Sequence, residues 1–217
     1  MALKSTLRRL FPELYVVTRG MKLLYSSRSF LKQSGYVESI RQHQPLEEHG
    51  DPIPWMNYQV IHFLRTRLRQ EHHLFEYGSG FSTEFYAGLV GKVVSVEHDT
   101  NWFKRLQQSK PDNVEVIYRD IVDIESYCSA AKQQGENYDI IVVDGRERVR
   151  CIKSSVEQLT TRGVIILDDS ARERYREGMT FLRQRGFKQL DFIGLKPGGI
   201  STHQTTIFYR PDNCLDL

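Results

Sequence analysis

Short, nearly all-apolar segments alternate with segments of helical periodicity from about residue 51 onward, and this alternation constrains the fold more than any other feature. Two of the apolar segments, YDIIVVDG at 138–145 and RGVIILDDS at 162–170, contain runs of Ile and Val. Such runs are typical of strands that are covered on both faces. Because helices separate successive strands, the pattern predicts an α/β fold with a doubly wound, mainly parallel sheet.

The pattern divides the chain into seven predicted strands and the helices between them. Strands are expected at 72–78, 92–99, 113–120, 138–145, 162–170, 188–195 and 203–210. Helices are expected from Pro54 through 55–68, at 82–90 with Ser82 or Thr83 as the cap, and at 100–108, 121–134, 149–159 and 173–186. Only a Pro-Gly-Gly turn separates the last two strands, so they are expected to form an antiparallel C-terminal hairpin at one edge.

A basic helical appendage, residues 1–50, is expected to precede a single α/β domain at 51–217. Residues 1–32 contain seven Lys and Arg residues against Glu13, a net charge of 7 − 1 = +6, which leaves 3 − 6 = −3 for residues 33–217. One interpretation is a solvated appendage that packs on the domain. The other is peripheral contact of residues 1–32 with an anionic membrane surface.

The cysteine content, the hydropathy and the first residues of the sequence bear on the expected cellular location. The three cysteines are too few and too scattered for a disulfide framework, and no Cys/His spacing suggests zinc. No apolar run of about 18 residues is present. The opening is a poor signal peptide because Pro12 and Glu13 interrupt it. We therefore expect a cytoplasmic location, with membrane contact left open, and the sequence gives no oligomeric state.

Carboxylates stand at the predicted carboxyl ends of the first five strands. They are Glu76, Glu97, Asp120, Asp144 and Asp169. Single acids at such positions are common as turn residues and helix caps. In an open parallel sheet, however, ligands bind outside the carboxyl ends of the strands. A series of acids at every one of these ends therefore indicates a binding site.

The first of these ends opens the stretch FEYGSGFSTEFYA, residues 75–87, with glycines at Gly78 and Gly80. A dinucleotide-binding turn needs a third glycine where this chain has Thr83, and a phosphate-binding P-loop needs a lysine that is absent. Glu76 would repel a pyrophosphate, whereas the same carboxylate suits a ligand that carries an ammonium group.

With these residues the chain resembles the class I S-adenosylmethionine-dependent methyltransferases, which have a Rossmann-like domain. The resemblance covers about 55–210 and centres on E-x-G-x-G at Glu76, Gly78 and Gly80, with Glu97 at the next strand end. The third glycine that is usual in the family is Ser82 here. The late antiparallel hairpin is also what the family implies.

The resemblance implies a role for each residue of the cofactor site. Glu76 and the glycine loop would border the methionine part of S-adenosylmethionine. Glu97 would accept both ribose hydroxyls, which a carboxylate does through charge-assisted hydrogen bonds. His98 would border the adenine, Asp120 would accept from its amino group, and Ile121 would lie against the ring.

Asp144 and Asp169 are the candidate catalytic residues, because they end the strands that face the expected acceptor. They resemble the carboxylates of cation-dependent O-methyltransferases, which hold Mg²⁺ with an Asp and an Asp-Asn pair. Ser170 stands where that Asn is expected, so Mg²⁺ is left open. The alternatives are a general base that needs no metal and purely structural turn acids.

The segment after Asp144 bears on the acceptor. It reads DGRERV rather than the Asn/Asp-Pro-Pro-Tyr/Phe of many N-methyltransferases, so oxygen is the expected methylated atom. Four nearby basic residues would suit an anionic acceptor such as a sugar acid or phosphate, or simply form a solvated helix face; they are Arg146, Arg148, Arg150 and Lys153. Nucleic acid is not expected, because the domain carries net negative charge.

Four further residues have a plain structural interpretation beside a functional one. Core packing is favoured over a cofactor contact for Trp55 and Tyr58. An ordinary edge-strand position is favoured over a catalytic role for His203. Trp102 would either flank the adenine or pack its helix against the sheet.

The sequence thus predicts an S-adenosylmethionine-dependent methyltransferase that acts on a small-molecule acceptor, with oxygen as the expected atom. Two alternatives stay open. One is a catalytically inactive module that binds S-adenosylmethionine or a nucleotide, and the other is an NAD-dependent oxidoreductase, against which Thr83 argues.

Overall fold

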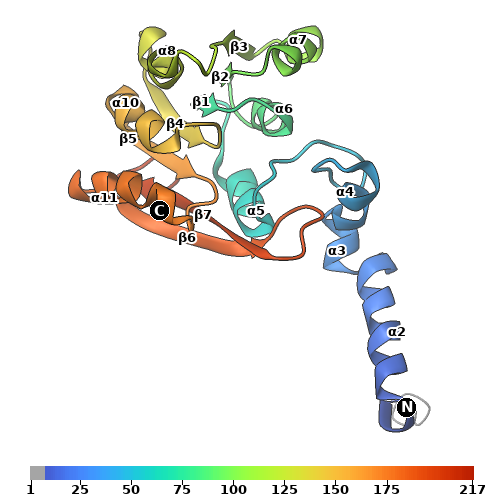
Figure 1. Ribbon diagram of the computed structural model, residues 1–217. Helices are drawn as coiled ribbons and strands as arrows, with labels where there is room; N and C mark the ends of the chain where they lie inside the picture. Colours follow the sequence, from blue (N-terminus) through green and yellow to red (C-terminus); the bar gives the residue numbers. More distant parts are fainter. Residues whose placement is uncertain (1–7) are drawn as a thin grey trace.

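A computed structural model describes residues 8–217 and confirms the predicted seven-stranded sheet (Figure 1). The strands lie in the order β3-β2-β1-β4-β5-β7-β6. β1 to β5 pair in parallel, and β7 pairs antiparallel with both β5 and β6. The bounds are β1 (His73–Tyr77), β2 (Lys92–Glu97), β3 (Val114–Tyr118), β4 (Tyr138–Val143), β5 (Leu159–Leu167), β6 (Lys188–Leu195) and β7 (Thr202–Tyr209).

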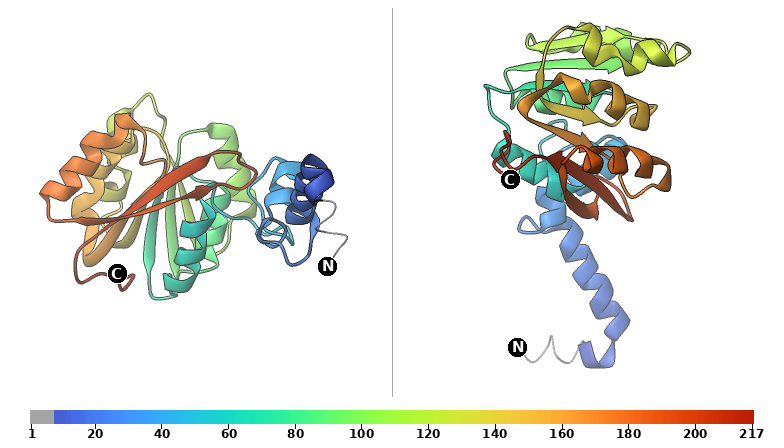
Figure 2. Two further views of the ribbon diagram at one scale, coloured as in Figure 1. Left: turned by 90° about the horizontal axis from the view of Figure 1, so that it is seen from below. Right: turned by 90° about the vertical axis from the view of Figure 1, so that its left-hand side faces the viewer.

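Helices cover both faces of the sheet (Figure 2). Their bounds are α5 (Tyr58–Arg67), α6 (Phe81–Ala87), α7 (Thr100–Ser109), α8 (Ile124–Cys128), α9 (Ala130–Gln133), α10 (Arg148–Ser155) and α11 (Arg176–Gln184), with short 3₁₀ turns η1 (Val156–Gln158) and η2 (Glu173–Tyr175). The first three pack on one face and α8 to α11 on the other. This is the doubly wound arrangement that the alternating pattern predicts.

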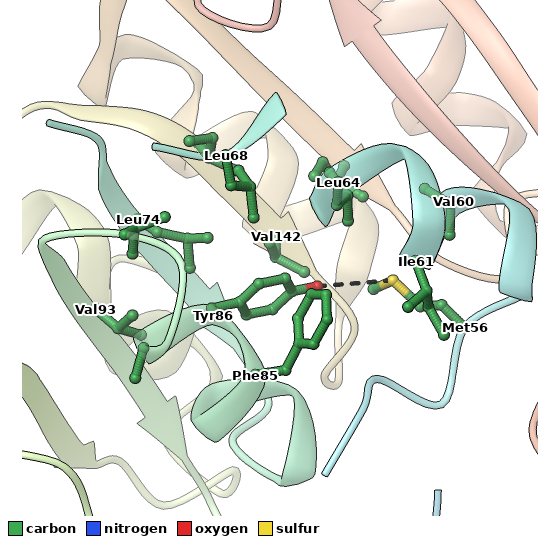
Figure 3. Packing of buried hydrophobic residues seen from close by; sticks show 14 of the residues in the cluster. Met56, Val60, Ile61, Leu64, Leu68, Leu74, Phe85, Tyr86, Val93 and Val142 are labelled. Atoms are coloured by element: carbon green, nitrogen blue, oxygen red, sulfur yellow. Dashed lines mark hydrogen bonds between the residues drawn. The ribbon is translucent and has the colours of Figure 1, made fainter. Parts of the chain in front are cut away.

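The core divides into two clusters because successive side chains of a strand point to opposite faces. In β4, Ile140 and Val142 belong to the cluster beneath α5 and α6, whereas Ile141 and Val143 belong to the cluster beneath α8 to α11. Figure 3 shows the first cluster, where the fully buried Tyr86 lies 3.7 Å from the sulfur of Met56. All three cysteines are free and buried.

Three local predictions were wrong. The helix expected from Pro54 begins only at Tyr58, because Asn57 caps it by accepting from the Val60 amide at 3.1 Å. The helix expected at 82–90 starts at Phe81 with Gly80 as its N-cap, so Ser82 and Thr83 lie inside it; Thr83 still accepts from the Gly80 amide at 2.9 Å. The helix expected over 121–134 is interrupted at Ser129 into α8 and α9.

The described part of the N-terminal appendage has two components. Helices α3 (Phe30–Gln33) and α4 (Tyr36–Gln42) lie against the domain, where Tyr36 is buried and donates to the Gly199 carbonyl at 2.9 Å. Helix α2 (Pro12–Tyr25) buries none of its residues and projects away from the domain (Figures 1 and 2). No helix within residues 8–217 is long and apolar enough to cross a bilayer.

Candidate functional site

The glycine loop between β1 and α6 is folded tightly against the end of β4. Gly78 has a φ of +94°, and a Cβ there would come within 2.8 Å of the Cα of Gly145. No larger residue fits this position. At Gly80 a Cβ would meet only the Ser82 hydroxyl, at 3.9 Å, so the missing side chain leaves the mouth of the loop open. The loop is therefore a turn of partly exposed backbone at the edge of the cavity.

Glu76 lies beneath this loop and does not line the cavity above it. Its carboxylate is fully buried and accepts from Ser82 Oγ at 2.5 Å, Thr83 Oγ1 at 2.6 Å and Ser95 Oγ at 3.0 Å. Burial raises the pKa of Glu76 to about 7, against the effect of these three hydrogen bonds. The structure thus places Glu76 as the anchor of the loop and of the first turn of α6.

Glu97 and His98 face the open side of the loop. Glu97, only 3% exposed, accepts from the backbone amides of Asp99 at 2.7 Å and His98 at 2.8 Å through one oxygen, and from Ser79 at 3.1 Å through the other. Trp102 donates to the Ser79 carbonyl at 2.9 Å. The end of β2 and the start of α7 therefore hold the loop in place, and all these residues except Asp99 line the cavity.

Asp120 and Ile121 are not brought to this cavity. Asp120 is exposed and accepts from the backbone amide of Val122 at 2.9 Å, so its carboxylate caps its own turn. Ile121 is partly buried and packs on the cluster beneath α8 to α11. Their expected contacts with adenine would need a movement of the loop after β3.

The cavity itself has a volume of about 1000 Å³. It runs from the glycine loop and Glu97 past Asp144 to a group of basic residues at the start of α10 and around η2. Its basic side chains are Arg105, Arg146, Arg148, Arg150, Arg172 and Arg174. Residues 43–45, from the appendage, also line it, so the N-terminal segment contributes to the site.

A second pocket, of about 530 Å³, adjoins the first. Trp55 and Asp144 line both, and the rest of the second pocket consists of Asp168, Asp169, Lys196, His203 and residues 197–199. Trp55 is 51% exposed and donates to the Pro197 carbonyl at 3.2 Å, so its expected core position was wrong, whereas Tyr58 is buried as expected. Asp144 thus stands on the wall between two pockets.

The carboxylate of Asp144 is held by Arg148. The guanidinium lies 2.7 Å from an Asp144 oxygen and also donates to the carbonyls of Asp144, Gly145 and Asp168. Burial, together with the neighbouring Asp168 carboxylate, raises the pKa of Asp144 to about 8, and Arg148 opposes that rise. An acid with this pKa exchanges a proton near neutral pH, which is what a general base requires.

A lysine ammonium lies between the two acids at the end of β5. Lys196 Nζ is 2.7 Å from Asp168 and 2.9 Å from Asp169. Although burial opposes the charge, the two carboxylates raise the pKa of Lys196. Burial likewise acts against the charge of Asp169, yet Lys196, His203 at 3.1 Å and Arg172 at 2.5 Å hold the pKa of its carboxyl below the usual range.

These donors do not fit the Mg²⁺ site that the sequence leaves open. Within residues 8–217, no three His, Cys, Asp or Glu side chains gather as a metal would need. The position between Asp168 and Asp169 is taken by the Lys196 ammonium. Ser170, which stands in place of the expected Asn, is buried and bonds to Thr206 at 2.7 Å.

Solved structures of known proteins resemble this chain, although its sequence matches no known family. No protein-family model and no curated protein matches the sequence. A methyltransferase-like protein from Silicibacter pomeroyi is 24% identical over 70% of this chain and 88% of its own, with a TM-score of 0.52. An rRNA methylase from Streptococcus thermophilus is 17% identical over 70% of this chain and 95% of its own, also with a TM-score of 0.52. The N-methyltransferase NodS from Bradyrhizobium japonicum was solved in complex with S-adenosyl-L-homocysteine. It is 15% identical over 90% of this chain and 97% of its own, with a TM-score of 0.51.

These likenesses agree with the strand order and the antiparallel position of β7. The chain has the class I methyltransferase fold. In this methyltransferase fold, β6 runs parallel to β5 with β7 between them, so the end of β6 reaches the same rim as the other strand ends.

Three residues of the site were not predicted from the sequence. Lys196 directly follows β6, and the parallel direction of β6 is the signal that would have found it. Arg172 and Arg174 lie in the turn after β5 and line the cavity. Of the basic residues that were predicted, Arg148 holds strand ends. Lys153 does not line the cavity itself but pairs with Glu177, which does.

Proposed function

We propose that this chain is an S-adenosylmethionine-dependent methyltransferase that methylates a hydroxyl oxygen of a small anionic acceptor. The observation that carries the proposal is the position of Asp144. It lines both the cavity above the glycine loop and the pocket beside Lys196, and its pKa is about 8. A base at the wall between a cofactor space and an acceptor space has the position that O-methylation requires.

The cavity fits the cofactor. The partly exposed backbone at Gly78 and Gly80 would hold the methionine part, and Glu97 would accept the ribose hydroxyls. His98 and Trp102 would lie beside the adenine. The NodS structure of the same fold carries S-adenosyl-L-homocysteine, which supports this assignment. When bound, S-adenosylmethionine supplies an electrophilic methyl group on a sulfonium, so the protein has mainly to position the acceptor.

The residues of this chain would then act on the acceptor as follows. A hydroxyl placed in the second pocket would give its proton to Asp144 as its oxygen takes the methyl group, and the carbon–sulfur bond would break to leave S-adenosylhomocysteine. Arg148 keeps that carboxylate oriented at 2.7 Å. His203, fixed by Asp169 at 3.1 Å, and the exposed Trp55 form the opposite side of the pocket.

Turnover is expected to be independent of divalent metal. The Lys196 ammonium supplies the positive charge between Asp168 and Asp169, 12% exposed and within 2.9 Å of both. Rates in EDTA and in added Mg²⁺ should therefore be equal. A rate that is lost in EDTA and restored by Mg²⁺ would contradict this assignment.

Arg146 and Arg174 would bind the anionic group of the acceptor at the basic end of the first cavity, past Asp144, while the hydroxyl of the acceptor lies in the second pocket. Both line the cavity, and no carboxylate among residues 8–217 lies within 4.0 Å of either. Arg174 instead stacks 4.9 Å over Tyr175. Guanidinium groups of this kind suit bidentate contact with carboxylate or phosphate.

Methyl transfer from labelled S-adenosylmethionine to hydroxylated carboxylates, phosphates and neutral analogues tests the acceptor class. Arg174→Gln is expected to raise the KM for the anionic acceptor roughly tenfold or more, since a charge-assisted hydrogen bond is worth about 1.5–3 kcal/mol. Arg185→Gln is the matched control, because Arg185 also stacks on an aromatic ring, 3.8 Å over Phe181, but does not line the cavity. Equal KM values for all three proteins would contradict an anionic acceptor.

Other functions have less support. In a dinucleotide site the third glycine would replace Thr83, but Thr83 is buried and bonds to both Glu76 and the Gly80 amide. A catalytically inactive module that only binds the nucleoside would not require a carboxylate such as Asp144 between two pockets. An RNA acceptor, as for the rRNA methylase of the same fold, is disfavoured by the net charge of −3 on residues 33–217, that is +3 less +6.

A further inference from the structure

Helix α2 carries an exposed apolar stripe. Leu14, Val17 and Met21 follow one another at intervals of three and four residues, which places them on one face of the helix. Their side chains are 52%, 59% and 52% exposed. Leu10, one turn earlier on the same spacing, is 62% exposed. Solvent exposure of this many large apolar side chains in one row marks an interaction surface.

The basic residues of α2 lie off the stripe. By helical periodicity, Arg19 lies about half a turn from the stripe and Lys22 about a third of a turn, and the exposed Val16 and Leu23 share the face around Arg19. Together with Arg8, Arg9 and Arg28, Arg19 and Lys22 stand against a single acid, Glu13. Among residues 8–217, no carboxylate lies within 4.0 Å of any of these five basic side chains. Their charge is therefore available to a partner outside the described chain.

The stripe is also free of the domain. α2 buries none of its residues and, from its C-terminal end beside α3, where Leu24 packs on the core, extends away from α4 and the sheet (Figures 1 and 2). A helix with an apolar stripe, basic side chains off that stripe and too little apolar length to span a bilayer is suited to lie in the plane of a membrane surface. Anionic headgroups would complement the unpaired arginine and lysine side chains.

We infer that α2 docks the protein peripherally on an anionic phospholipid surface, with Leu14, Val17 and Met21 in the acyl boundary and the basic side chains among the headgroups. This inference does not depend on the methyl-transfer activity. The base of the arm adjoins the second pocket, because a Cβ at Gly198 would lie 3.6 Å from Ile40 of α4, and Tyr36 donates to the Gly199 carbonyl. Docking would therefore hold the pocket close to the lipid surface.

Co-sedimentation of the full chain with phospholipid vesicles tests whether α2 docks on an anionic membrane surface. The wild-type protein is expected to bind vesicles of phosphatidylcholine with phosphatidylglycerol, and to bind pure phosphatidylcholine weakly. Leu14→Asp with Val17→Asp should abolish binding. Arg19→Glu with Lys22→Glu should reduce partitioning at least about tenfold at low salt, since each basic residue contributes about 1 kcal/mol. Val122→Asp, at an 87% exposed apolar residue outside the arm, is the matched control and should bind as wild type.

Circular dichroism and thermal denaturation of each variant establish that the domain is folded. Unchanged vesicle binding of the Leu14→Asp, Val17→Asp variant would overturn the inference. A second outcome would also overturn the inference: the wild type does not bind vesicles but self-associates in analytical ultracentrifugation, and the Leu14→Asp, Val17→Asp variant does not self-associate. The stripe would then contact a second copy of the chain.

Discussion

Asp144→Asn is expected to lower kcat by about 10² to 10⁴-fold, the range for loss of a positioned general base. The amide keeps the shape of the side chain but cannot accept the acceptor's proton. Arg148 retains its bonds to the carbonyls of Asp144, Gly145 and Asp168, so the strand ends should stay in place. Binding of S-adenosylhomocysteine should be nearly unchanged, because Asp144 serves the acceptor.

The pH profile distinguishes this role from a structural one. The pKa of Asp144 is raised to about 8, so the carboxyl is protonated below that pH and becomes a base only above it. The rate of the wild type should therefore rise with pH through about 8, and the small rate of Asp144→Asn should not. Asp112→Asn, at an exposed acid away from the cavity, is the matched control. Full turnover in Asp144→Asn would remove the base assignment.

Glu97→Ala is expected to weaken binding of S-adenosylhomocysteine by at least about 30-fold. Each hydrogen bond to a carboxylate is worth about 1.5–3 kcal/mol, and two ribose hydroxyls would lose theirs. The amides of Ser79, His98 and Asp99 lose their acceptor in the same change, so the loop should also become less ordered.

A calorimetric titration of two further variants tests whether the loss of affinity comes from the Glu97 carboxylate oxygens. Glu97→Gln keeps one acceptor oxygen and should bind with intermediate affinity. Glu115→Ala, at an exposed acid on β3, should bind as wild type. Equal affinity of Glu97→Ala and wild type would show that the ligand is held elsewhere.

The sequence predicted what depends on local pattern. Apolar runs located the strands, and a parallel sheet then placed Glu97, Asp144 and Asp169 on one rim. Asp120 illustrates the limit of that argument, because its carboxylate bonds to the Val122 amide in its own turn. Position at a strand end does not fix where a side chain points.

What the sequence could not supply came from contacts between distant segments. Lys196 reaches Asp168, 28 residues away, only because β6 runs parallel to β5 on the far side of β7. The raised pKa of Asp144 depends on burial and on Asp168, which no spacing encodes. The exposure of Trp55 follows from its hydrogen bond to Pro197 in the hairpin turn.

Isothermal titration with S-adenosylhomocysteine, with NAD titrated in parallel, tests whether the cavity above the glycine loop binds the methyl-donor cofactor. We expect saturable one-site binding of S-adenosylhomocysteine in the micromolar range that is unchanged by EDTA, with no comparable binding of NAD. Absence of binding of S-adenosylhomocysteine to the folded protein, or tighter binding of NAD, would contradict this expectation.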